Sequence, residues 1–346
     1  MSQILADCRR PTVMITAAVM ALLAAAPLLG ASNYSIAILT SLLGFMLLGM
    51  SINLVAGHAG LLTLAHAAYA GVGAYASVLV SRNLTHSALV QLAAAVVAAT
   101  AVAAATGWIA VRAYKMYFLM LSLAIGELLF RAAMRWRSFT GGNDGLGAGA
   151  PMELVPGTPI LLSGYVYWLA FLVFAVCAGL VLLVVRSPFG SSLRGIRDNE
   201  ERMRGLGYST AYYKYAVWTF SGAIAGAAGW ILAAQMPRFI TPATMSFHLS
   251  ALLLLAVIIA GRGSMWGGCV GVAIVILMTD VVSQDLGGHG PLLLGLIFVL
   301  AVYLVPHGLA GIGRERRRRR KEADGPPEPS RPEDAGEPEP AKEVTT

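Results

Sequence analysis

Charged residues are scarce in this chain of 346 residues: Asp, Glu, Lys and Arg together make up 12%, whereas apolar residues make up 57%. The mean hydropathy is +0.69. Soluble domains carry about 25% charged residues, so this composition excludes a soluble domain and predicts an all-α, polytopic membrane protein. The apolar runs are too long, and alternate too little, for the strands of an outer-membrane β-barrel.

Patterns that bind metals or nucleotides are also missing. The three cysteines are widely spaced, so neither a disulfide framework nor a metal site is expected. His58 and His66 lie eight residues apart without an H-E-x-x-H pattern or a carboxylate companion. No Walker A sequence (G-x-x-x-x-G-K-[ST]) is present. We therefore expect no catalytic residue, no metal and no cofactor bound by this chain.

Long apolar runs, in contrast, are abundant. Windows of about 20 residues predict about ten transmembrane helices, with eight to ten as the range. The third is rich in Gly and Ala and the eighth is short, so either could be broken or re-entrant. The predicted spans are residues 13–30, 35–56, 60–80, 88–111, 115–134, 161–185, 214–235, 247–261, 265–284 and 291–306.

The basic residues predict the orientation of these spans. The tail from Arg314 onward carries nine basic and nine acidic residues, which leaves 16 basic and nine acidic residues in the rest of the chain. Ten spans place 11 of those 16 basic residues on the side of the N-terminus and five on the other side. The positive-inside rule then predicts that both termini are cytoplasmic, and the excess of positive charge needs no nucleic-acid partner.

Three parts of the chain follow from this topology. Residues 1–12 are expected to form a cytoplasmic N-terminus, and residues 13–310 the transmembrane domain. Residues 13–30 are expected to be a retained first span rather than a cleaved signal peptide. Residues 311–346, with six prolines after Arg314 and almost no apolar residues, are expected to be a disordered, charged cytoplasmic tail.

One polar stretch interrupts the apolar runs. Residues 187–213, here called the charged loop, connect two predicted spans and are too long for a simple turn. Apolar residues alternate in it with charged ones at the spacing of a short amphipathic helix. A membrane protein with a structured, charged cytoplasmic helix of this kind usually presents it to another protein.

Small and polar residues mark two further segments. S-G-A-I-A-G-A-A-G at residues 221–229 predicts close helix packing. Within residues 53–75, four polar side chains accompany glycines at membrane depth: Asn53, His58, Thr63 and His66. Irregular backbone at this depth is tolerated where it is buried in protein or lines a cavity. This segment is therefore either part of the translocation path or a set of polar contacts between helices.

A carboxylate and a glycine-rich loop follow. Glu127 lies within a predicted span, four residues before Arg131, and is either half of a structural ion pair or a group that acts in gating or passage. The loop T-G-G-N at residues 140–143 offers several hydrogen-bonding groups. Thr140, Gly141, Gly142 and Asn143 are therefore candidates for the mouth of the path, or simply members of an ordered turn.

Four ordered blocks resemble a known family. They are N-L-V-A-G-H-A-G-L-L-T-L-A-H-A-A-Y-A-G-V-G-A-Y at 53–75, the G-E span with T-G-G-N-D-G at 117–145, S-P-F-G-S-S-L-R-G-I-R-D-N-E with G-L-G at 187–207, and G-R-G-S-M-W-G at 261–267. The chain resembles the membrane permeases of branched-chain amino acid (Liv-type) ABC importers, closer to the LivM-like half. The resemblance covers about residues 35–306 and implies a permease of the Liv/ribose-permease type.

The resemblance also implies partners and roles. A second Liv-type permease, two cytoplasmic ABC ATPases that bind ATP and Mg²⁺, and an extracytoplasmic solute-binding protein would complete an importer in the bacterial cytoplasmic (inner) membrane. The charged loop would be the coupling helix, with Arg194, Arg197 and Glu200 as polar contacts, Leu193 and Ile196 as apolar footing, and Gly190 and Gly207 as ends. Glu201, Arg202 and Met203 depart from the small residues frequent in the family, so the ATPase contact is expected to be bulkier.

Two alternatives stay open at this point. The transported solute could be a branched-chain amino acid or another small solute such as urea, an amide or an aromatic acid. An ion-coupled secondary transporter, with Glu127 and Asp280 as candidate carboxylates, is the alternative from another class; it would have no need of a structured cytoplasmic helix.

Overall fold

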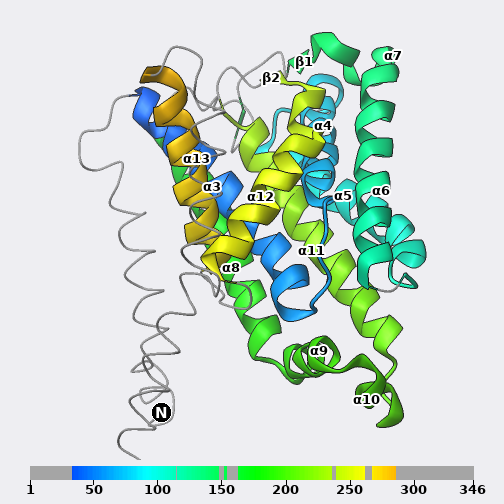
Figure 1. Ribbon diagram of the computed structural model, residues 1–346. Helices are drawn as coiled ribbons and strands as arrows, with labels where there is room; N and C mark the ends of the chain where they lie inside the picture. Colours follow the sequence, from blue (N-terminus) through cyan, green and yellow to red (C-terminus); the bar gives the residue numbers. More distant parts are fainter. Residues whose placement is uncertain are drawn as a thin grey trace, which may run out of the picture.

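The computed structural model describes residues 33–113, 115–147, 152–153, 163–235, 239–261 and 267–285, and these form a bundle of helices with one two-stranded sheet (Figure 1). The longer helices are α3 (Asn33–Asn53), α4 (His66–Asn83), α5 (Ala88–Ala110), α6 (Lys115–Arg135), α8 (Ser163–Arg186), α11 (Thr210–Ala233), α12 (Phe247–Ala260) and α13 (Gly267–Asp285). The shorter elements are η2 (Leu54–His58), α7 (Arg137–Thr140), η3 (Gly142–Asp144), β1 (Leu146–Gly147), α9 (Pro188–Asp198), α10 (Glu200–Gly205), β2 (Phe239–Ile240) and η4 (Pro242–Met245).

These helices coincide with eight of the ten predicted spans. The first and tenth predicted spans, the N-terminus, the tail and residues 262–266 lie outside the described residues, as does the side chain of Asp280. Five described helices are long and apolar enough to cross a membrane: Tyr34–His58, Ala88–Ala110, Met116–Arg135, Gly164–Arg186 and Thr210–Ala233. The helices predicted from the apolar runs are therefore confirmed within the described residues. These residues alone do not give the full number of spans.

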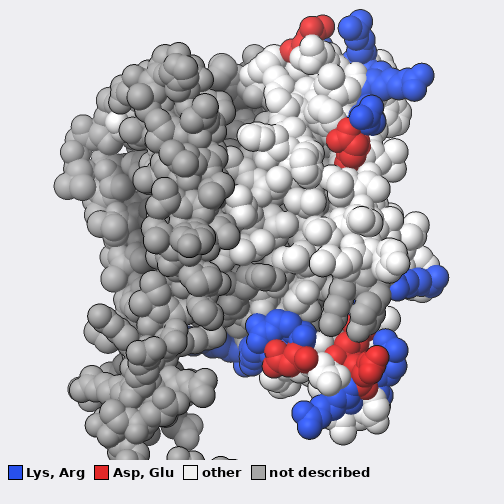
Figure 2. Space-filling view, viewed as in Figure 1, with Lys and Arg blue, Asp and Glu red and all other residues white. Residues whose placement is uncertain are grey.

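Successive helices run in alternating directions, so their connections gather at two ends of the bundle (Figure 1). One end, at the bottom of the view, holds η2, α9 and α10, and is called the charged-loop end. The opposite end holds α7, β1 and β2. In Figure 2, Lys, Arg, Asp and Glu lie mainly at these two ends, and a broad uncharged belt separates them on the face shown. An uncharged belt between charged ends is the surface that a bilayer requires.

Three helices pack closely at the centre through small residues. A Cβ atom added to Gly73 of α4 would lie 2.7 Å from the Gly226 carbonyl oxygen of α11. One added to Gly226 would lie 2.6 Å from the Cβ of Ala99 in α5. Such distances leave no room for a larger side chain, so the glycines in residues 221–229 serve close helix packing, as their spacing predicts.

The third predicted span begins six residues later than expected. The prediction was residues 60–80, but α4 starts at His66, and α3 ends instead in the π-helical turn η2. Residues 59–65 between them are not helical. Gly60 has a φ of +76°, which a helix cannot accommodate. The connecting backbone is held inside the protein, since the Leu64 N–H donates to the Ser122 hydroxyl of α6 over 3.1 Å.

Candidate functional site: the charged loop and its anchorage

Helix α9 turns sharply away from α8. Ser187 is its N-cap and accepts a hydrogen bond from the Gly190 N–H, and Pro188 occupies the first turn, where its missing N–H costs nothing. A Cβ atom at Gly190 would lie 2.6 Å from the Val184 carbonyl oxygen, so only glycine permits this turn. The predicted end residue Gly190 thus lies inside the first turn of α9.

One face of α9 is buried against the bundle. Leu193 is fully buried and Ile196 is 3% exposed, which places both as the apolar footing that the amphipathic pattern predicts. Arg194 lies on the same side, and its guanidinium donates to the Val185 carbonyl at the end of α8 over 3.0 Å. A cationic side chain at the last carbonyls of a helix is favourable there.

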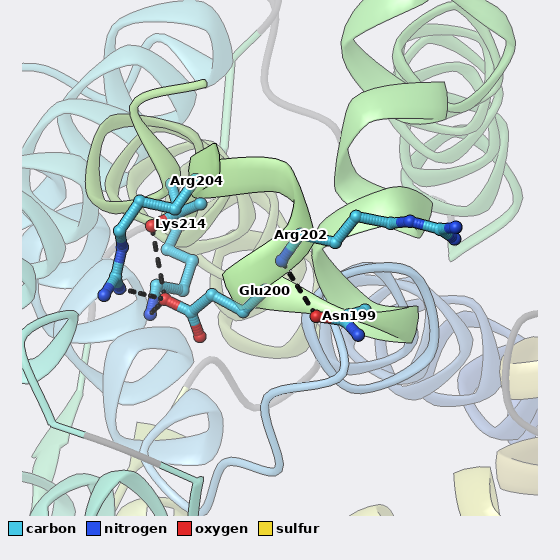
Figure 3. A network of polar contacts seen from close by, with 6 residues as sticks. Asn199, Glu200, Arg202, Arg204 and Lys214 are labelled. Carbon is cyan, nitrogen blue, oxygen red and sulfur yellow. Dashed lines mark hydrogen bonds and ion pairs between the residues drawn. The ribbon is translucent and has the colours of Figure 1, made fainter. Parts of the chain in front are cut away.

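The charged loop contains two helices rather than the single helix predicted. Asn199 adopts an extended conformation, with a φ of −155°, and ends α9. Its side-chain oxygen accepts a hydrogen bond from the Arg202 N–H over 2.9 Å and so caps α10 (Figure 3). Gly207, with a φ of +87°, follows α10. Asn followed by Glu-Glu is a helix-start signal that sequence reasoning passed over.

Glu200 lies at the centre of a network that ties α10 to the start of α11 (Figure 3). Its carboxylate accepts hydrogen bonds from Lys214 (2.7 Å), Thr210 (3.2 Å) and Arg204 (3.2 Å). Burial of the carboxyl opposes its ionisation, but the hydrogen bond and charge of Lys214, with Thr210 and Arg204, outweigh burial and lower the pKa of Glu200 below its ordinary value of 4.5. Glu200 was predicted to contact the ATPase. In the structure, its carboxylate instead binds residues of this same chain.

Arg197 reaches a segment 140 residues earlier in the chain. Its Nη1 atom donates to the Gly57 carbonyl oxygen of η2 over 2.7 Å, and its Nε atom donates to Asp198 over 3.0 Å. The same helix end contains His58, whose Nδ1 atom lies 3.3 Å from the Asn53 carbonyl oxygen. The charged loop is therefore anchored to α8, α11 and η2 through Arg194, Glu200 and Arg197.

The outward side of the charged loop combines charge with exposed apolar groups. Leu206 is 68% exposed and Tyr212 is 64% exposed. Glu201, Arg202, Arg204 and Tyr208 are exposed as well. The exposed surface of the charged loop therefore consists of these residues rather than of Arg194 and Glu200.

The candidate path residues at 53–66 are all buried. Asn53, His58, Thr63 and His66 are each less than 5% exposed. The two ring nitrogens of His66 lie 3.1 Å from the Thr63 hydroxyl and 3.0 Å from the Ser221 hydroxyl of α11. The ring of His66 also packs edge to face on Trp218. His66 thus contacts another helix, as the packing alternative predicts, and a sequence alone could not pair it with Ser221.

The T-G-G-N segment belongs to α7 and η3, at the end of the bundle opposite α9 (Figure 1), whereas His58 belongs to η2, which is bonded to α9 through Gly57 and Arg197. The structure therefore does not bring the T-G-G-N segment together with His58. Thr140 is buried, and its hydroxyl lies 2.9 Å from the Trp136 carbonyl oxygen and 2.5 Å from that of Ala133. Gly141 and Gly142 have φ values of +74° and +61°. Asn143 is exposed.

Glu127 forms an ion pair with Arg131 on the outside of α6. The Arg131 Nε atom lies 2.8 Å from the carboxylate, and the side chains of Arg131 and Glu127 are 76% and 33% exposed. The pairing at i and i+4 matches the structural alternative given for Glu127.

Comparison of the sequence with known proteins identifies a family that includes both ends of this bundle. The model of a family described as the branched-chain amino acid transport system permease component matches residues 34–305. The chain belongs to this family. No solved structure matches it.

Individual relatives agree with that assignment. The high-affinity branched-chain amino acid transport system permease protein LivM of Salmonella typhimurium is 25% identical over 306 residues, covering 82% of this chain and 71% of that protein. LivM of Escherichia coli K12 is 24% identical over the same shares. The probable branched-chain amino acid transport permease protein LivH of Methanocaldococcus jannaschii is 27% identical over 165 residues, covering 45% of this chain and 51% of that protein.

Family membership confirms the Liv-type resemblance drawn from four blocks and makes this chain a permease component, a multi-pass membrane protein that serves transport. The matched range includes η2, the charged loop and the opposite end. Most residues that sequence reasoning missed in this permease have a partner farther along the chain: Gly57, Thr210, Lys214 and Ser221. Asn199 is the exception, because it caps α10 locally.

Proposed function

We propose that this permease is one of two membrane subunits of an ATP-driven ABC importer for branched-chain or related amino acids in the bacterial cytoplasmic membrane. Its relatives are named for branched-chain amino acid transport, which supports the solute class. A second Liv-type permease would complete the translocation path. Two cytoplasmic ATPases would supply the energy, because the chain has no P-loop of its own.

The observation that carries this proposal is the charged loop itself. It is a structured pair of helices outside the apolar belt, anchored to three parts of the bundle, with an exposed outer side. Rigid anchorage of a surface element serves to transmit force from something that grips it. The outer residues Arg202, Leu206 and Tyr212 form the surface that an ATPase would contact. The distribution of Arg and Lys supports a cytoplasmic location for it.

The opposite end then faces the solute-binding protein. Arg135 and Arg137 lie there beside the exposed rings of Trp136 and Phe139. The permease carries no chemistry: ATP binding on the partner subunits moves the charged loop, and a loaded binding protein contacts the other end. Each ligand biases an equilibrium between outward-facing and inward-facing states, because each binds one state better than the other.

Reconstitution tests the proposal. We expect proteoliposomes with both permeases, both ATPases and the binding protein to take up radiolabelled leucine only when ATP is supplied on the ATPase side. Competition with isoleucine, valine, urea, an amide and an aromatic acid identifies the solute class. Uptake that persists without the ATPases and follows a proton or sodium gradient would contradict the proposal.

A further inference from the structure

The junction between the charged loop and η2 has a geometry that anchorage of α9 alone does not require. Arg194 and the buried Leu193 already fix α9 to the bundle beside α8. Arg197 adds a bond to an element that is distant in sequence, the end of α3. Its 2.7 Å distance to the Gly57 carbonyl is short for a nitrogen donor, as charged donors typically give.

The Arg197 side chain, although 35% exposed, is held at three places. Its Nε atom donates to Asp198, which orients the guanidinium. Its aliphatic part lies directly on Gly60, where an added Cβ atom would be 2.6 Å from the Arg197 Cγ atom. Gly60 has a φ of +76°, so both the space and the backbone conformation at this position require glycine.

A pocket adjoins this junction. It has a volume of about 260 Å³ and lies between residues 59–61 and the junction of α9 with α10, and Lys214 lines it from the side of α11. Its lining includes Arg197, Asp198 and Glu200. Beside this pocket, Arg197 adds a directional polar bond to η2, next to the buried apolar side chain of Leu193.

Beyond Gly60, the same segment enters the membrane part of the bundle. The Leu64 N–H binds Ser122 of α6, and His66 contacts Ser221 of α11. Residues 54–66 therefore connect Arg197 to the centre of the bundle through a stretch that lacks regular α-helix. This stretch is largely buried, and its backbone is held by individual bonds, such as that of Leu64 to Ser122, instead of by a continuous helical ladder.

We propose that Arg197 is a positioning residue that carries movement of the charged loop into residues 54–66, so that loss of its bond to Gly57 uncouples ATP hydrolysis from uptake. This inference rests on the proposed function. It differs from a docking role, because the bond of Arg197 points into the permease and the ATPase surface lies on the outer residues.

The test compares variants of α9 in the complete reconstituted transporter. Arg197→Met keeps the aliphatic stem on Gly60 but removes the donor, and Arg197→Lys restores a charged donor. We expect Arg197→Met to assemble with the ATPases and to hydrolyse ATP at about the wild-type rate. Leucine uptake per ATP should fall by about tenfold or more, the loss expected when a hydrogen bond from a charged donor is removed. Arg197→Lys should recover part of it.

Ser191→Ala is the matched control, since Ser191 is exposed on the same helix and its hydroxyl donates only within α9, to the Pro188 carbonyl. Its uptake and its ATP hydrolysis should stay in the wild-type ratio. Gly60→Ala gives an independent variant: its methyl group displaces the Arg197 stem, and we expect the same uncoupling. Hydrogen exchange of the amides of residues 57–65 reports the conformational step. It should respond to ATP with vanadate in the wild type and lose that response in Arg197→Met.

The inference would be overturned if Arg197→Met took up as much leucine per ATP as the wild type does. It would also be overturned if hydrogen exchange at residues 57–65 of this variant still responded to ATP with vanadate. Loss of the ATPases from purified Arg197→Met complexes would also overturn it, since Arg197 would then be a docking contact. The proposed function fails in a different measurement: the wild-type complex would then show no ATP-dependent uptake. That result would also overturn the inference about Arg197.

Discussion

The two ends of the bundle are held together by different means. At the charged-loop end, charged side chains bind backbone or each other over long sequence distances: Arg197 with Gly57, and Glu200 with Lys214. At the opposite end, the contact is an antiparallel backbone pairing, in which Leu146 of β1 pairs with Ile240 of β2. Side-chain bonds can be exchanged as states interconvert, whereas a backbone pairing with glycines in left-handed conformations has few alternatives. The charged-loop end is therefore anchored by bonds that can be exchanged for others, and the opposite end by a fixed backbone pairing.

The largest effect is expected at the opposite end. Gly145 has a φ of +76°, and an added Cβ atom would lie 2.6 Å from the Ile240 carbonyl oxygen. Gly145→Val should lower the stability of the β1–β2 pairing by about 3 kcal/mol, through backbone strain and steric overlap. Thermal unfolding in detergent and hydrogen exchange at Leu146 measure this.

Gly147→Val is the control for that substitution. It lies in β1, two residues after Gly145, and a Cβ atom there would be 3.7 Å from the nearest atom, in the Phe239 ring. We expect a change below about 0.5 kcal/mol, as at surface positions. Equal losses in both variants would mean that general sensitivity of the strand, rather than the conformation of Gly145, holds this end together.

At the charged-loop end, Glu200→Gln should have the next largest effect. The side chains of Glu200 and Lys214 are 13% and 6% exposed, so removal of the carboxylate charge leaves the Lys214 cation without its anion in a nearly buried place. The expected loss is about 2 kcal/mol, in the range for hydrogen bonds to charged groups. Hydrogen exchange of α10 measures it, and Glu201→Gln, on the exposed side, should leave exchange unchanged.

Acid should produce the same change without a mutation. Because the folded pKa of Glu200 is lowered, chiefly by Lys214 acting against burial, the carboxylate stabilises the fold above its ordinary pKa of 4.5. That stabilisation is lost as the pH falls below 4.5 through the folded value. Wild type and Glu200→Gln should therefore differ in α10 exchange at pH 7 and converge in acid. A difference that persists at the lowest pH would contradict this assignment.

The features that could be predicted from sequence are the local ones, and those that could not are the contacts between distant residues. Apolar runs of membrane-spanning length located the helices, because burial in a bilayer depends on local composition. The small residues at 221–229 predicted close packing, because spacing on one helix face is also local. Arg197 and Gly57 are 140 residues apart, and no periodicity relates them. The hydrogen-bond partner of a charged side chain depends on which loop lies beside it, and the tertiary fold determines which loop that is.

The π-helical turn and the late start of α4 illustrate a second limit. Gly57, His58 and Gly60 predicted irregular backbone at membrane depth but not its form. Whether such a segment lines a cavity or packs between helices depends on its neighbours, here Ser122 and Ser221. Sequence reasoning left both alternatives open for His66, and the internal contacts of its ring favour packing.

The smallest effect concerns Thr140, a candidate for the path that lies at the end held by backbone pairing. Its hydroxyl has one hydrogen to donate, to the Trp136 carbonyl at 2.9 Å or to that of Ala133, and it accepts from the Gly142 N–H over 3.3 Å. Thr140→Val keeps the volume but leaves these groups unpaired, so we expect a loss of about 1 kcal/mol in thermal stability. Thr140→Ser keeps the hydroxyl and should lose less. If leucine uptake by folded Thr140→Val protein fell strongly while its stability stayed at the wild-type level, Thr140 would belong to the path, and the opposite end would be more than a rigid backbone frame.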